Sequence, residues 1–96
     1  ALGNIVFLEL KRRSYEVYIG KNAAKEIDFI GTRRNEKIYV QVCVQLPENS
    51  DREVGNLMEI PDHYPKYVVT TNGLDVGNEN GIRIVLLADF LLTEKW

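Results

Sequence analysis

Residues 25–46 read KEIDFIGTRRNEKIYVQVCVQL. Alternating apolar and β-branched residues predict one strand over Lys25–Thr32 and another over Lys37–Leu46, joined by a polar hairpin loop at Arg33–Glu36. The apolar run of the later strand is typical of a central strand that is buried on both faces. The segment therefore predicts a hairpin at the centre of a sheet.

The register of this hairpin determines which polar side chains lie together. Pairing Arg34 with Asn35 sets Asp28 opposite Gln41, and directly opposed residues project from the same face of a sheet. Asp28 lies among apolar residues, where a carboxylate without a partner is costly. Glu9 lies on the core-facing stripe of a predicted helix, and we expect it to approach the same spot. Two carboxylates and an amide oxygen are ligands that suit Mg²⁺.

Outside the hairpin, the pattern predicts helices and strands in the order α-β-β-β-α-β-β. A helix between the third and fourth strands permits a parallel crossover. We therefore expect one α/β domain over residues 1–96, a mixed β-sheet flanked by helices. The other predicted elements are a helix over Leu2–Ser14, a strand over Tyr15–Gly20, a helix over Asp51–Glu59, a strand over Lys66–Thr71, a loop over Asn72–Gly81, a strand over Ile82–Leu87 and a last helical turn over Ala88–Leu92.

Composition limits the class of protein. The 96 residues are 45% hydrophobic, enough for one core and too few for two. A net charge of −2 gives no overall electrostatic attraction to nucleic acid. The lone Cys43 cannot form an internal disulfide, which predicts a reducing cytoplasm. No apolar run is long enough to span a bilayer. Because the chain starts at Ala1 without a methionine, we expect a piece of a longer polypeptide.

Three segments resemble a known group of proteins: IVFLELKRRSYEVYIGK at 5–21, KEIDFI at 25–30 and EKIYVQVC at 36–43. They are similar to the domain of unknown function that follows the ATPase module in a family of prokaryotic AAA+ type ATPases. The arrangement also resembles the PD-(D/E)xK, or restriction-endonuclease-like, superfamily, and the resemblance covers almost the whole chain. It implies a restriction-endonuclease-like fold and an N-terminal ATPase module in the parent chain.

The same resemblance assigns the motif positions and exposes two departures. Asp28 matches the motif aspartate, and Glu9 matches a helix glutamate that many members carry. Gln41 stands at the second acid and Cys43 at the lysine of the (D/E)xK element. Nucleases of this kind need the metal and the positive charge at the phosphate. Gln41 offers only a neutral oxygen, and a cysteine cannot replace an ammonium, so we expect no catalytic residue.

We therefore expect a non-catalytic accessory domain of an ATP-binding AAA+ type protein, with no cofactor in this segment and a protein as its partner. Two alternatives stay open. One is a magnesium-dependent nuclease with an altered site, in which Asp28, Glu9 and Gln41 hold Mg²⁺ weakly. The other is a DNA-binding module that does not cleave. No GxxxxGK[ST] loop occurs, so the segment itself does not bind ATP in the P-loop manner.

Two basic clusters bear on the DNA-binding alternative. Arg12 and Arg13 close the first predicted helix, and Arg33 and Arg34 form the hairpin tip. We expect a solvated helix end and a solvated hairpin tip, which do not make a groove-length patch for phosphates. His63 lies in a proline-flanked turn and is expected at the surface, so no histidine-containing catalytic pair is apparent.

Overall fold

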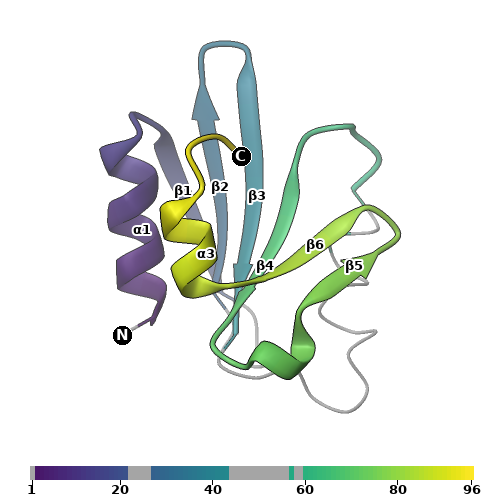
Figure 1. Cartoon of the computed structure of the whole chain (residues 1–96). Coiled ribbons are helices and arrows are strands. Elements are labelled where there is room, and N and C mark those ends of the chain that lie inside the picture. The colour runs from purple at the N-terminus through teal and green to yellow at the C-terminus, as the bar shows by residue number, and fades with distance from the viewer. Residues whose placement is uncertain (1, 22–26, 44–56, 58–59) are drawn as a thin grey trace.

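A computed structural model describes residues 2–21, 27–43, 57 and 60–96 of the chain. It shows one α/β domain with a mixed sheet and two helices among these residues (Figure 1). The elements are α1 (Leu2–Arg12), β1 (Glu16–Lys21), β2 (Ile27–Arg33), β3 (Glu36–Val42), β4 (Lys66–Thr70), the 3₁₀ turn η1 (Gly73–Asp75), β5 (Gly77–Glu79), β6 (Ile82–Leu86) and α3 (Leu87–Leu92).

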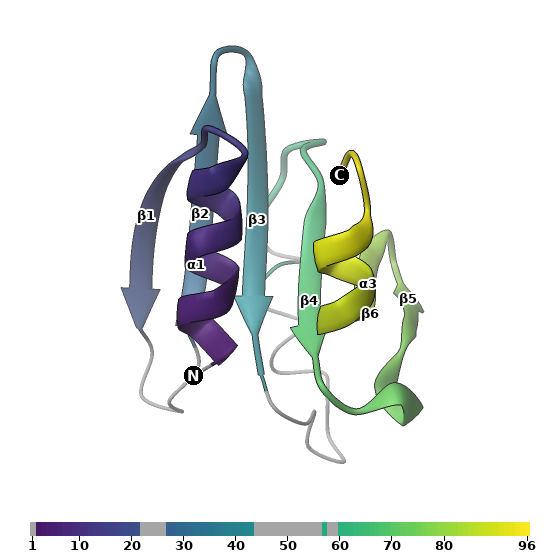
Figure 2. The same ribbon diagram turned by 60° about the vertical axis from the view of Figure 1, so that its left-hand side comes forward.

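The six strands form one sheet in the order β1-β2-β3-β4-β6-β5. The first three strands pair antiparallel as a meander, while β4 is parallel to both β3 and β6. The short β5 returns antiparallel along β6 and forms the far edge. Both helices lie on the same face of the sheet, α1 in front of the meander and α3 in front of β4 and β6 (Figure 2). No helix of the described residues is long and apolar enough to cross a membrane.

Strand β3 is buried on both of its faces, as its apolar run predicts. Its residues from Ile38 to Val42 are all buried, because successive side chains of a strand point to opposite faces and each face of β3 is covered. The helix-side core comprises Val6, Leu10, Tyr15, Phe29, Ile38, Val40, Val42, Tyr67, Val69 and Phe90. The second core, on the other face, comprises Tyr39, Leu57, Val68, Ile82 and Ile84.

The predicted hairpin is confirmed in its register. Asp28 pairs with Gln41, and Arg33 pairs with Glu36 across a two-residue turn. Arg34, the first turn residue, has a φ of 51°, in the left-handed region. The predicted strand ends at 25–26 and 44–46, and the predicted helix over 51–59 apart from the helical Leu57, lie outside the described residues.

The predicted loop over 72–81 is wrong in part, because it contains η1 and β5. The side chain of Asn72 accepts a hydrogen bond from the N–H of Leu74 and caps η1. Asn80 and Gly81 have φ values of 52° and 85° and make the tight turn between β5 and β6. Asn-Gly is a strong hairpin signal, but the Gly77–Glu79 strand beside it has no apolar alternation to announce it.

Gly31 offers a test of how tightly the helix-side core is packed. A Cβ added at this residue would lie 3.0 Å from Cγ2 of Ile38 and 3.1 Å from Cδ1 of Tyr15. Overpacking of this kind costs about 1–3 kcal/mol, so Gly31→Ala should lower the urea midpoint. Gly20 is the matched control, because an added Cβ meets nothing within 4 Å there. Equal losses of stability in Gly20→Ala and Gly31→Ala would contradict this packing.

Candidate functional site

The strand pair of β2 and β3 holds the positions that the sequence singles out. Gln41 is 1% exposed and lies between Tyr39 and Cys43 on the face of the second core. Cys43 is half-buried and packs against that core. The backbone of Asp28 is opposite Gln41, while its side chain lies outside the described part of the structure. The position that resembles a catalytic lysine is therefore part of an apolar cluster.

Glu9 does not join this strand pair, and the expected convergence is corrected here. It belongs to α1, which covers the helix-side core, whereas Gln41 faces the second core on the far side of the sheet. Its carboxylate instead accepts hydrogen bonds from Arg12 Nη2 at 2.6 Å and Arg13 Nε at 2.7 Å. The hydrogen bond from Arg12, with that from Arg13, lowers the pKa of Glu9 from 4.5 to about 2 although partial burial opposes the shift. Glu9 is thus a charged partner for two arginines.

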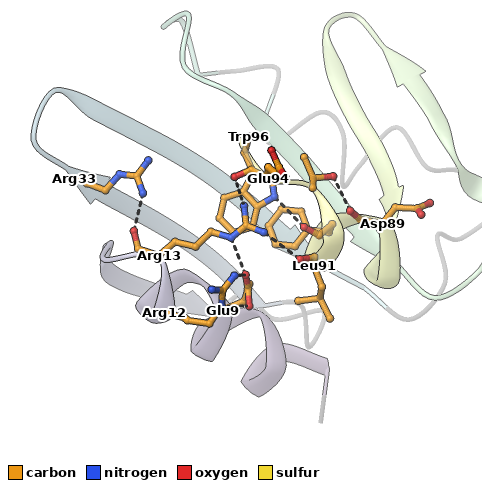
Figure 3. Close-up of polar contacts among 10 residues, drawn as sticks. Glu9, Arg12, Arg13, Arg33, Asp89, Leu91, Glu94 and Trp96 are labelled. Atoms are coloured by element: carbon orange, nitrogen blue, oxygen red, sulfur yellow. Dashed lines mark hydrogen bonds and ion pairs between the residues drawn. The ribbon is translucent and has the colours of Figure 1, made fainter.

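Arg13 joins α1 to the C-terminal end of α3 (Figure 3). Besides binding Glu9, its guanidinium donates to the carbonyl oxygens of Leu91 at 3.1 Å and Glu94 at 3.3 Å. It also lies 3.7 Å from the ring centroid of Trp96, a cation–π contact. The side chain is only 10% exposed. All three nitrogen atoms of the Arg13 guanidinium therefore donate hydrogen bonds within the fold.

Trp96 supports this arrangement from the other side. Its ring stacks on Phe90 with centroids 4.2 Å apart, and its indole N–H donates to the Phe90 carbonyl at 3.0 Å. The ring centroid of Tyr15 lies 6.1 Å from that of Trp96, so Tyr15 packs beside these residues. We call Glu9, Arg13, Phe90 and Trp96 the Arg13 cluster.

The two basic clusters of the sequence meet at this end of the molecule. Arg33 Nη1 donates to the backbone carbonyl of Arg13 at 2.6 Å, and Arg33 Nη2 binds Glu36 at 2.8 Å. The Arg33 guanidinium also lies 4.3 Å from the ring centroid of Tyr15. The expectation of a solvated hairpin tip and helix end is therefore wrong for Arg33 and Arg13, whose charges are engaged within the fold.

An open groove of about 660 Å³ lies beside these arginines. Its walls carry both signs of charge, so the groove is not a uniformly positive track for a phosphate backbone. It is lined by Arg13, Ser14, Glu16, Thr32, Arg33, Arg34 and Glu36.

A second polar cluster, centred on Asp62, was not predicted. Asp62 accepts hydrogen bonds from the Tyr39 hydroxyl at 2.5 Å, from Lys66 Nζ at 2.9 Å and from the Tyr64 N–H at 3.0 Å. Partial burial alone would raise its pKa, but the Tyr39 and Lys66 hydrogen bonds lower the pKa to about 2. Asp62 directly precedes His63 in the proline-flanked turn, and no local pattern of the sequence signals a partner on β3. The predicted surface position of His63 is confirmed, since this residue is exposed.

The described residues contain no group of three or more histidine, cysteine, aspartate or glutamate side chains that could hold a metal ion. Asp62 is satisfied by three donors from the protein itself, and Glu9 by its two arginines. Within the part of the chain that the structure describes, both clusters thus connect one element of the fold to another.

This chain is similar to a known bacterial protein. An uncharacterized protein of Haemophilus influenzae is 44% identical over 91 residues, which is 95% of this chain and 22% of that protein. The chain therefore spans about a fifth of its relative's length. No protein-family model and no solved structure matches the chain.

The Arg13 cluster predicts a large difference between two neighbouring arginines. Arg13→Ala removes the guanidinium from Glu9, two carbonyl oxygens and Trp96, and should cost about 2–4 kcal/mol of unfolding free energy. Arg12→Ala is the matched control, because the Arg12 side chain is 68% exposed and surface ion pairs contribute little. Denaturant unfolding of both variants measures the difference. Similar midpoints would show that Arg13 does not hold α1 to α3.

The lowered pKa of Glu9 predicts an acid-dependent stability. Because the folded pKa of about 2 lies below the ordinary value of 4.5, the contribution of Glu9 is present above pH 4.5 and is lost as pH falls toward 2. Glu9→Gln cannot show this loss. The difference in unfolding free energy between wild type and Glu9→Gln should therefore shrink over that pH range. If the difference in unfolding free energy stays constant with pH, Glu9 does not form an ion pair in the folded state.

Proposed function

We propose that this chain is a non-catalytic domain of the restriction-endonuclease-like type that serves a longer ATPase polypeptide as a partner-binding module. The proposal has three parts: the loss of catalysis, the kind of fold and the longer polypeptide. Each is supported by a separate observation.

The observation that carries the proposal is the environment of Gln41 and Cys43. In the nucleases that the sequence resembles, these positions hold an acid and a lysine that meet the metal and the phosphate. Here Gln41 is 1% exposed and Cys43 packs against the second core. A charged group at such a position needs a partner, and a catalytic group needs access to substrate. Neutral side chains at both positions, Gln41 buried and Cys43 half-buried, support a domain that does not cut.

The topology supports the kind of fold. A helix leads into a three-stranded antiparallel meander, and the following strand lies parallel beside the last strand of that meander. The hairpin of β2 and β3 places Asp28 opposite Gln41. This arrangement is expected of a restriction-endonuclease-like domain in which the catalytic residues have been replaced.

The longer polypeptide is supported by the relative from Haemophilus influenzae. The matched segment is 22% of that protein, so a domain like this one occurs there within a much longer chain. The resemblance of segments 5–21, 25–30 and 36–43 to a domain that follows an ATPase module suggests what the remainder does. An ATPase module in the parent chain is therefore part of the proposal.

One observation favours a second candidate, a DNA-binding module that does not cleave. The basic clusters at the end of α1 and at the tip of the β2–β3 hairpin lie side by side. Arg12 and Arg34 are the exposed members. A titration of labelled duplex DNA, followed by fluorescence anisotropy, separates the candidates. Tight binding that persists at physiological salt and falls in Arg12→Gln with Arg34→Gln would favour the DNA-binding module.

The proposal predicts no cleavage of duplex DNA or of RNA with Mg²⁺ or Mn²⁺. Product formation over time should be the same for wild type and for Asp28→Ala, because Asp28 lacks the acid and lysine partners that such chemistry needs. Gel electrophoresis of end-labelled substrates measures the product formed over time. Time-dependent cleavage by wild type that disappears in Asp28→Ala would establish the nuclease with an altered site instead.

A further inference from the structure

The two edges of the described sheet differ in what they offer to a partner. β5 is three residues long, Gly-Asn-Glu, and carries no apolar side chain. β1 is six residues long and exposes Tyr18 at 57% and Ile19 at 55%. An edge strand leaves alternate backbone N–H and C=O groups without strand partners. Among the strands that the structure describes, β1 therefore combines an edge without a strand partner with exposed apolar side chains, whereas β5 is short and polar.

The other exposed large apolar residues of the described chain lie on helices or near η1. They are Ile5, Leu8, Leu74, Val76 and Leu92. None of them belongs to an edge strand, so none of them offers a backbone ladder to a partner. On β1, by contrast, Ile19 is opposite Phe29, which is buried in the helix-side core and lies 6.3 Å from the ring of Phe7. The row Phe7, Phe29 and Ile19 runs from the core to the open edge.

We propose that two copies of this chain associate through β1, which pairs antiparallel with β1 of the second copy about a two-fold axis perpendicular to the sheet. An axis in this direction keeps each face of the sheet continuous across the junction, and closed two-fold pairs are the commonest assemblies of identical chains. The helix side of one copy then meets the helix side of the other.

The sequence of β1 is compatible with itself in this arrangement. With Tyr18 opposite Tyr18 of the second copy, Val17 lies opposite Ile19 and Glu16 lies opposite Gly20. Apolar and aromatic side chains thus meet across the junction, which stabilises strand pairs. Each Glu16 faces a glycine, so no like charges are opposed. A parallel, in-register pairing would instead set Glu16 against Glu16, which favours the antiparallel arrangement of the two copies.

Sedimentation of the chain over a concentration series tests the interface. Wild type should shift from monomer to dimer as concentration rises, and Ile19→Lys should remain monomeric because a lysine blocks edge pairing. Leu74→Lys is the matched control, since Leu74 is 94% exposed and lies in η1; it should dimerise like wild type. Circular dichroism checks that both variants fold. A monomeric wild type, or a dimer that Ile19→Lys leaves intact, would overturn the proposal.

Disulfide cross-linking tests the register. In a Cys43→Ser background, Tyr18→Cys should give a covalent dimer on mild oxidation, because directly opposed Cα atoms lie about 4.5–5.5 Å apart. Ile19→Cys should not, since its counterpart is a diagonal neighbour about 7–8 Å away. Cross-linking of neither variant would reject the interface, and cross-linking of Ile19→Cys alone would reject this register. A monomeric chain without nuclease activity would reject the dimer and leave the proposed function standing.

Discussion

Burial of β3 on both faces restricts which residues the strand can carry and where its two neighbours can pair. Its residues from Ile38 to Val42 alternate between two cores, so each of these five side chains must suit an apolar surrounding. The antiparallel neighbour β2 and the parallel neighbour β4 both take their register from it. The same burial decides the chemistry at Gln41, because an ionised acid or a lysine there would need a partner inside the second core.

Charged groups accordingly act at the periphery of the sheet. Arg13 fixes the end of α1 to the C-terminal end of α3, and Asp62 fixes the turn before β4 to the hydroxyl of Tyr39. Glu9 accepts hydrogen bonds from two arginines, whereas Asp62 accepts from a lysine, a hydroxyl and a backbone N–H, and both acids keep their charge. These contacts connect elements that are distant in sequence, so they close the fold around the central strands without placing a charge in either core.

Much of this could be predicted from the sequence, where the signal is local. The polar tip at Arg34 and Asn35 fixed the hairpin, and with it the pairing of Asp28 with Gln41, because a register follows from its turn. The face of Glu9 could not be predicted. A helical stripe indicates that a residue faces a core, but it does not tell which face of a sheet that core belongs to. Tyr39, a partner of Asp62, and Leu91, a partner of Arg13, lie 23 and 78 residues away in sequence, beyond any local pattern.

The most direct test of the account asks whether the strand pair binds a metal at all. Paramagnetic Mn²⁺ broadens the NMR signals of nearby amides, so a titration followed at Phe29, Gln41 and Val42 reports on this site alone. A degenerate site predicts no selective broadening in wild type. The double variant Gln41→Glu with Cys43→Lys restores the acid and the lysine of the motif. It should therefore gain selective broadening of these amide signals by Mn²⁺. Selective broadening of these amides in wild type, lost in Asp28→Ala, would contradict the claim that the site is degenerate.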